Sequence, residues 1–204
     1  MRTTTRSRWS GGESGAAAPG AAVESSFRCS RAAHRQPAAP PVDAWAAVLT
    51  GGFLIRTDGA ARGNPGPASL GAALYDLGRP DARDHRAQPD ASISEFLGVQ
   101  TNNVAEYTGT LRALELAREL GAREVHLLLD SKLIVEQLAG RWRVKDAKLI
   151  PLWAACRQVL GGLDRWSAMH VPRAQNSIAD ALANAAIDRV TAGGPVLIVR
   201  RPTG

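Results

Sequence analysis

The stretch GFLIRTDGAARGNPGP, residues 52–67, decides the fold of this chain. Its apolar start predicts a buried β-strand over Phe53–Thr57. Asp58 follows directly, and the next nine residues contain three glycines and two prolines. Glycine and proline at this density predict a tight turn, so the strand ends with a carboxylate beside a sharp reversal of the chain.

Two further strands follow this turn. Leu70–Tyr75 and Ile93–Val99 have the apolar composition of strands, and residues 76–89 between them are rich in charged side chains. The charged segment predicts an exposed hairpin connection. Three strands joined in succession favour an antiparallel meander.

The second half of the chain alternates helices with strands. An amphipathic helix is expected over about residues 102–120, and the apolar run Val125–Leu129 is typical of a parallel strand covered on both faces. Pro151 is unfavourable inside a helix, so the pattern leaves the start of the third helix undefined. The remaining expected elements are helices over 131–139 and 147–160, a strand over 166–171, and a final helix with Asn176 as its N-cap.

This order of elements predicts an α/β fold. The expected architecture is a five-stranded mixed sheet, made of a three-strand antiparallel meander plus two parallel strands, with helices packed on it. Composition divides the chain into three segments. Residues 1–50, rich in Ala, Gly, Ser, Pro and Arg, predict a disordered arm, and residues 51–192 predict a single domain. Residues 193–204 are expected to be a tail, in which the apolar run 196–199 either adds an edge strand or stays loose.

Net charge and cysteine content bound the possible functions. The chain has a net charge of +6 and a pI near 10.1, but residues 1–50 hold six arginines against three acidic residues, so the domain is closer to neutral. Cys29 and Cys156 are far apart and suit a reducing compartment. No apolar run approaches the ~20 residues that a membrane span needs. These features predict a soluble, cytoplasmic monomer with no membrane partner.

Acidic residues fall at the ends of predicted strands and the starts of predicted helices. Asp58 and Asp130 each follow a parallel strand. Ligands of open α/β sheets bind at the C-terminal ends of the strands, where both residues would lie. With the first strand in the centre of the sheet, these two carboxylates would be neighbours. Glu106 and Asp180 lie in the first turn or so of their helices and can reach the same edge.

Four carboxylates at one edge repel one another strongly unless cations neutralise them. Oxygen ligands select Mg²⁺ or Mn²⁺, and the chain has no Cys/His cluster with zinc spacing. Two such ions would activate a water and stabilise the leaving oxygen in phosphodiester cleavage. Each acid also has a purely structural reading: Asp58 bonding its own turn, Glu106 completing a capping box with Asn103, Asp130 capping a helix, and Asp180 complementing a helix dipole.

Polar and basic segments near these acids are candidate nucleic-acid contacts. Thr101-Asn102-Asn103 either caps a helix or presents its amides to a phosphate or a 2′-hydroxyl. The segment RWRVK, residues 141–145, suits a nucleic-acid backbone, although Trp142 can equally pack against the sheet. His126 and His170 lie within predicted strands and are interpreted as structural, because neither pairs with Ser or Cys in a recognisable nucleophile motif.

Four segments resemble type I ribonuclease H over about residues 52–190: TDGAARGNPGPASLGAALYD, TNNVAEYTGTLRALELA, LLLDSKLIVEQLAGRWRVK and HVPRAQNSIADALANAAID. They stand in the family's order, each with its acid, and the loop before the last acid, residues 172–175, resembles that of an actinobacterial and archaeal subgroup. The resemblance implies a ribonuclease H-like fold. It also implies Mg²⁺-dependent cleavage of the RNA strand of RNA–DNA hybrids, with Mn²⁺ as an alternative ion, leaving 3′-hydroxyl and 5′-phosphate ends.

Carried over by position, the resemblance implies that the catalytic, metal-binding carboxylates, which would hold two ions, are Asp58, Glu106, Asp130 and Asp180. It implies minor-groove contacts with the hybrid from Asn64, Asn102 and Asn103, and the glycine turn would bring Asn64 close to the nucleic acid. The full set of expected substrate-binding residues is Gly59, Arg62, Asn64, Thr101, Asn102, Asn103, Ser131 and Arg173.

Two departures from the family pattern alter this expectation. Many bacterial members carry a histidine, thought to help product release, in the loop before the last aspartate. Here that loop reads PRAQ, residues 172–175, with Arg173 as the substitute. Only about ten residues join the second helix to the third, so we expect the family's basic protrusion to be absent.

Two other functions stay open on the sequence. A binding module of the same fold that has lost cleavage would lack a carboxylate, and all four are present. Another metal nuclease of the wider superfamily, such as a junction resolvase or a 3′-to-5′ exonuclease, is disfavoured by the Asn102-Asn103 pair and the glycine turn.

Overall fold

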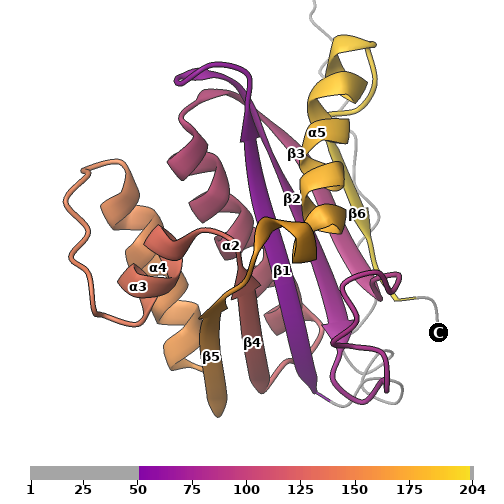
Figure 1. Ribbon diagram of the computed structural model, residues 1–204, viewed down its shortest axis with the longest axis vertical. Helices are drawn as coiled ribbons and strands as arrows, with labels where there is room; N and C mark the ends of the chain where they lie inside the picture. The colour runs from indigo at the N-terminus through magenta and orange to yellow at the C-terminus, as the bar shows by residue number, and fades with distance from the viewer. Residues whose placement is uncertain (1–50, 203–204) are drawn as a thin grey trace, which may run out of the picture. The chain divides into compact units, whose positions relative to one another are not determined.

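The computed structural model describes residues 51–202, so the predicted disordered arm lies outside the described residues. Within them the chain forms one six-stranded sheet with the strand order β5-β4-β1-β2-β3-β6 (Figure 1). The strands are β1 (Gly52–Ala61), β2 (Gly66–Asp76), β3 (Ala91–Gln100), β4 (Glu124–Leu129), β5 (Arg165–His170) and β6 (Leu197–Arg200). The helices are α2 (Asn102–Glu119), α3 (Lys132–Leu138), α4 (Leu149–Gly161), the short 3₁₀ turn η1 (Arg173–Gln175) and α5 (Ser177–Thr191).

The sheet is mixed, as the sequence predicts. β1 is antiparallel to β2 and parallel to β4, and β4 is parallel to β5. β2 pairs with β3 in antiparallel register and completes the predicted meander. The expected central place of the first strand is therefore confirmed, with the meander on one side of it and the parallel strands on the other.

The sheet has six strands rather than five, because the apolar run of the tail adds an edge strand, one of the two alternatives that the sequence left open. β6 pairs in antiparallel register with β3, from Ser92 opposite Arg200 to Glu95 opposite Leu197. Arg189, near the end of α5, binds both β3 and the segment that precedes β6. Its guanidinium donates to the Ser94 carbonyl at 2.8 Å, and its Nε donates to the Pro195 carbonyl at 2.7 Å.

Helices cover both faces of the central strand, and β1 is buried along most of its length. Successive side chains of a strand point to opposite faces. Phe53 and Ile55 accordingly pack into the larger core formed with α2, α3 and α4, and Leu54 packs into a second cluster toward α5. This double burial makes β1 the rigid element from which the polar residues at its end are positioned.

The strand β4 differs from its prediction, because only one of its faces is fully covered. Val125, Leu127 and Leu129 are buried, whereas the alternate residues are half-buried. The contacts of α5 with the sheet are with β1, β2 and β3, so it leaves the second face of β4 more open. There His126 lies 2.7 Å from the hydroxyl of Ser167 and 3.0 Å from Glu124, a contact with a serine that the sequence did not indicate.

The start of α4 explains how its proline is tolerated. Pro151 is the third residue of the helix. The first N–H groups of an α-helix have no partner within the helix, so a proline there removes no helical hydrogen bond. None of the helices in residues 51–202 is long and apolar enough to cross a membrane.

Small residues let α5 lie directly against the sheet. Gly71 of β2 faces this helix, and a Cβ atom at this position would lie 2.1 Å from the Ala179 carbonyl oxygen and 2.5 Å from the Ala183 nitrogen. The Ser69 hydroxyl donates to the Ala183 carbonyl at 2.6 Å across the same contact. The position of α5, which carries Asp180, therefore depends on close backbone approach.

We expect Gly71→Ala to lower the free energy of unfolding by about 3 kcal/mol or more, since the added methyl group must displace helix backbone. The matched control is Gly161→Ala at the end of α4, where a Cβ would meet no atom within 4 Å. Urea unfolding followed by circular dichroism measures both. Equal stability of the two variants would contradict the close packing of α5 on β2.

Candidate metal and nucleic-acid site

The ends of the central parallel strands bring two of the predicted acids to the same level. β1 and β4 pair as far as Ile55 opposite Leu127. Asp58 stands three residues after Ile55, and Asp130 stands three residues after Leu127. β1 itself continues to Ala61, because β2 still pairs with it. Asp58 therefore lies inside the strand, whereas the sequence predicted it at the end of the strand.

Asp58 is buried, with only 3% of its surface exposed. Its Oδ1 accepts a hydrogen bond of 2.8 Å from the Gly59 amide, and its Oδ2 has no donor among the described residues. Burial first, then the charge of Asp130 and the neighbouring carboxyl group of Asp180, raise the pKa of Asp58 to about 8. Asp58 thus lies in a place that favours a proton or another cation on its free oxygen.

Glu106 reaches this site from the first turns of α2. Its Oε1 accepts a 2.7 Å hydrogen bond from Asn102 Nδ2, and the neighbouring Ser131 side chain acts to lower the pKa of Glu106. Burial is the largest cause that raises the pKa of Glu106, and Asp130 adds to it. The predicted capping box with Asn103 is absent, because Thr101 is the N-cap and accepts from the Val104 amide.

Gly59 allows α2 to approach the strand at this point. A Cβ on Gly59 would lie 2.5 Å from the Glu106 nitrogen and 2.9 Å from the Glu106 Cγ. Gly59 was predicted to bind substrate, but it is buried and serves here as the contact between β1 and the start of α2. The glycine therefore sets the distance between Asp58 and Glu106.

Asn176 is a site residue whose role the sequence missed. It is fully buried, and its Nδ2 donates to Asp130 Oδ1 and to the Thr57 carbonyl, both at 2.9 Å. It occupies the N-cap position of α5 as predicted, but its side chain makes no capping hydrogen bond. Instead it fixes Asp130 to the backbone of β1. Only its position before a helix was visible in the sequence.

Asp180 lies in the first turn of α5 and is bound by Arg173. The same guanidinium lies 4.0 Å from Asp58 Oδ2. Asp180, and then Asp58, raise the pKa of Arg173. Arg173 is thus the cation that faces the acids in this structure, from the turn η1 in which its substitution for a histidine was predicted.

The four acids form a row in the order Asp180, Asp58, Asp130 and Glu106: the charges of Asp130 and Asp180 raise the pKa of Asp58, and the charge of Asp130 raises that of Glu106. Within residues 51–202, however, no three His, Cys, Asp or Glu side chains are arranged as a formed metal site. Arg173, Asn176 and Asn102 occupy oxygens of three of these carboxylates. The free, buried Oδ2 of Asp58 and the all-oxygen donor set nevertheless fit a hard divalent cation.

The structure places the predicted substrate-binding residues in separate groups. Asn64 and Asn102 are adjacent, since the Asn102 amide donates to Asn64 Oδ1 at 3.3 Å, and Asn103 beside them is exposed. Ser131 is next to Glu106. Arg62 is turned toward α5 and forms an exposed ion pair with Asp188. The contacts of these residues with a substrate stay predictions.

The basic segment 141–145 lies in the connection between α3 and α4, residues 139–148. Trp142 is 46% exposed and lies outside the hydrophobic cores, so its predicted alternative of packing against the sheet was wrong. Arg141 pairs with Glu136, and the side chains of Arg143 and Lys145 are exposed. The connection has the short length that the sequence indicated.

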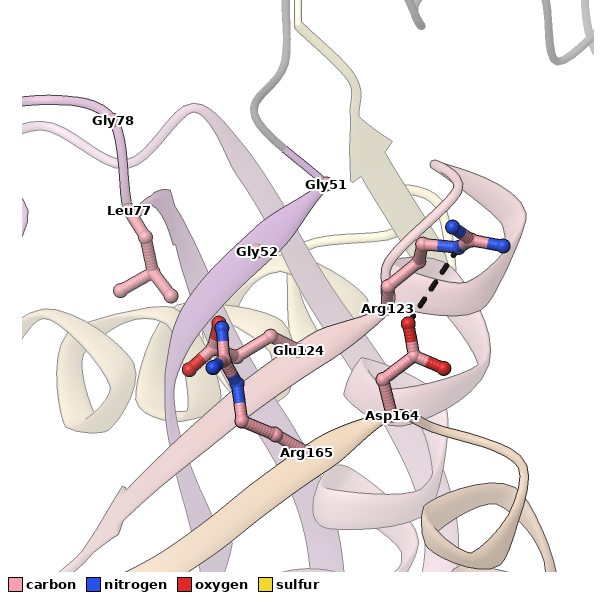
Figure 2. A pocket seen from close by; sticks show the side chains of 8 residues that line it. All are labelled: Gly51, Gly52, Leu77, Gly78, Arg123, Glu124, Asp164 and Arg165. Atoms are coloured by element: carbon pink, nitrogen blue, oxygen red, sulfur yellow. Dashed lines mark hydrogen bonds and ion pairs between the residues drawn. The ribbon is translucent and has the colours of Figure 1, made fainter.

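A separate cleft of about 590 Å³ lies at the opposite end of the parallel strands, where β1, β4 and β5 begin (Figure 2). Its charged residues are already paired: Arg165 with Glu124 at 2.7 Å and Arg123 with Asp164 at 3.8 Å. It contains none of the four predicted acids, so the candidate site lies at the other end of the sheet.

Comparison with known proteins gives a consistent result. A family model described as reverse transcriptase-like matches residues 56–186. The chain is 43% identical over 135 residues to the bifunctional protein Rv2228c of Mycobacterium tuberculosis, covering 66% of this chain and 35% of that protein. It is 42% identical over 135 residues to ribonuclease HI of Halobacterium salinarum, covering 64% and 62%. The chain thus spans about a third of the first relative and under two thirds of the second.

Solved structures agree with these relatives. The N-terminal RNase H domain of Rv2228c, solved as a fusion with maltose-binding protein, has a TM-score of 0.61 and 42% identity, covering 67% of this chain and 99% of that one. LC11-RNase H1 in complex with an RNA/DNA hybrid has a TM-score of 0.60 and 35% identity, covering 68% and 99%.

We expect Asp58→Asn to stabilise the domain in the presence of a chelator at alkaline pH. Because the pKa of Asp58 is raised from 3.8 to about 8, the folded protein holds this proton more tightly than the unfolded chain. The stability that this proton contributes is complete below about pH 4 and is lost as the pH rises through about 8. Asparagine keeps the shape without the charge. The gain above pH 8 should be at least about 1.4 kcal/mol, the equivalent of one pKa unit.

Urea unfolding at about pH 5 and pH 9 measures this effect, and the gain should shrink at the lower pH. Asp164→Asn, at an exposed aspartate at the other end of the sheet, is the control and should be neutral at both. A variant no more stable than the wild type at about pH 9 contradicts the raised pKa.

Proposed function

This chain belongs to the type I ribonuclease H family, and we propose that it is a metal-dependent endonuclease that cleaves the RNA strand of RNA–DNA hybrids. The observation that carries the proposal is the burial of Asp58 beside Asp130 and Asp180, with one oxygen left without a donor. A purely structural aspartate would have its oxygens satisfied.

The residues that would hold the metal are Asp58, Glu106, Asp130 and Asp180. Two bound Mg²⁺ ions, or Mn²⁺ in their place, would activate a water and stabilise the leaving oxygen, giving 3′-hydroxyl and 5′-phosphate products. The chain's own residues prepare this chemistry. Asn176 orients Asp130, Asn102 orients Glu106, and the glycine contact at Gly59 sets the spacing of β1 and α2.

The proposed substrate is an RNA–DNA hybrid. LC11-RNase H1, a similar protein, has been solved with such a hybrid. In this chain the adjacent amides of Asn64 and Asn102, with Asn103 beside them, would meet the minor groove, where the 2′-hydroxyl separates RNA from DNA. Arg62, Thr101 and Ser131 would complete the contact, and exposed Trp142 with its basic neighbours would meet a backbone.

Arg173 is proposed to act on turnover rather than on bond cleavage. It binds Asp180 and faces Asp58, so it competes with a cation for the same oxygens. In this role it would help to release the product, as the family's loop histidine is thought to do. Action as a monomer in the cytoplasm, where a reducing environment suits the two cysteines, stays part of the proposal.

We expect the wild-type chain to cut the end-labelled RNA strand of a hybrid in Mg²⁺, and to leave the DNA strand and a DNA duplex intact. Asp58→Asn should lower the cleavage rate by at least about 10³-fold, since it removes a carboxylate from the proposed metal ligands. Asp164→Asn is the control and should cut like the wild type. Equal cutting by Asp58→Asn would overturn the metal mechanism, and cutting of the DNA strand would assign the chain to another nuclease class.

We expect Arg173→Ala to reduce the steady-state kcat about tenfold, equivalent to about 1.4 kcal/mol in the rate-limiting barrier. The single-turnover rate should change less than about twofold, because bond cleavage precedes the step at which Arg173 acts. Arg173→His should retain more of the steady-state rate than Arg173→Ala. A parallel fall of both rates would place Arg173 in the chemical step instead.

A further inference from the structure

Arg56 is a buried arginine in the same strand as Asp58. It stands two residues before Asp58 on β1, so both side chains leave the same face of the sheet. Only 2% of its surface is exposed. Its guanidinium donates to the Gln175 carbonyl at 2.7 Å and to the Arg83 carbonyl at 3.4 Å. These two acceptors belong to the turn η1 and to the connection between β2 and β3.

The two hydrogen bonds of Arg56 do not offset the free-energy cost of removing its charge from water. A buried guanidinium is normally neutralised by a carboxylate. Within residues 51–202 no carboxylate lies within ion-pair distance of Arg56, and the charge of Asp84 acts on it only from further away. Its Nε also lacks an acceptor there, and burial lowers the pKa of Arg56. The neighbouring cluster contains Leu54, Ala73 and Tyr75, among which an apolar side chain would pack at lower cost. Stability therefore does not explain an arginine at this position.

The segment that Arg56 holds carries two residues of the candidate site. Gln175 ends η1, and Arg173, the partner of Asp180, begins it. The residue after Gln175 is Asn176, which binds Asp130. η1 lies between β5 and α5 (Figure 1), and all of its residues are exposed. The bond from Arg56 therefore ties an exposed turn to the central, buried strand of the sheet.

We propose that Arg56 is a positioning residue, whose buried guanidinium holds η1 on β1 and so sets where Arg173 faces the carboxylates. The inference rests on the proposed function of this site. Arg56 touches neither the substrate nor the reacting atoms. Its hydrogen bond to the Gln175 carbonyl acts on Arg173 through η1. Its hydrogen bond to the Arg83 carbonyl also fixes the guanidinium to the connection between β2 and β3.

The test compares Arg56→Met, which keeps length and removes the charge and donors, with Arg56→Lys, which keeps one donor. Steady-state kcat on an RNA–DNA hybrid should fall about tenfold in Arg56→Met, with KM within about twofold, and Arg56→Lys should recover part of it. The unfolding midpoint of Arg56→Met should equal or exceed that of the wild type. Tyr75→Phe is the control, because the Tyr75 hydroxyl is buried in the same cluster and bonds nothing among the described residues.

A double-mutant cycle with Arg173→Ala tests whether Arg56 acts through that residue. In the Arg173→Ala background, Arg56→Met should change kcat less than about twofold. Additive effects of the two substitutions overturn the proposal, as does a fully folded Arg56→Met with wild-type kcat. If Arg56→Met does not fold, Arg56→Lys in the same cycle decides, by the same criteria.

Amide hydrogen exchange separates this proposal from the proposed function. In Arg56→Met the amides of residues 173–176 should exchange at least about tenfold faster than in the wild type, while those of α2 stay unchanged. This result supports the tie to η1 even if the wild-type chain cuts no hybrid, an outcome that would reject only the proposed function. Unchanged exchange over 173–176 rejects the positioning role in either case.

Discussion

Repulsion among carboxylates is the constraint on which the functional end of this domain depends. Asp58 is buried beside Asp130 and Asp180, and its pKa is raised to about 8 because burial and these neighbours all disfavour its charge. Such an arrangement is unfavourable for folding alone. The domain tolerates it because β1 is covered on both faces and the strand cannot turn its side chain toward water.

Hydrogen bonds from surrounding residues fix the carboxylates of this cluster in place. Three of the four acids have a neutral or cationic partner: Asn102, on the same helix, for Glu106, Asn176 for Asp130 and Arg173 for Asp180. These partners fix the carboxylates in orientation without neutralising the whole row. The site is thus rigid while its net charge stays negative, a combination suited to binding cations.

Close backbone contacts position the elements that carry these side chains. Gly59 lets the start of α2 approach β1, and Gly71 lets α5 lie directly on β2. Arg56 adds a third tie, between β1 and the turn that precedes α5. The positions of Glu106, Asp180 and Arg173 therefore depend on backbone contacts and on Arg56, and not only on interactions among the carboxylates. Membership of the ribonuclease H family is consistent with such a framework.

The sequence by itself determined the features that depend on neighbouring residues. Hydrophobic periodicity predicted the elements from β1 to α5, and their order along the chain predicted the central place of β1. The acids that follow the parallel strands predicted that the site lies at one end of these strands. Only the tertiary structure decided contacts between residues far apart in the chain. Arg56 meets Gln175 across 119 positions, and Ser94 of β3 meets Arg189 across 95, which brings β6 to the sheet. The local sequence pattern does not predict such pairs, because the two residues come together only when the helices pack on the sheet.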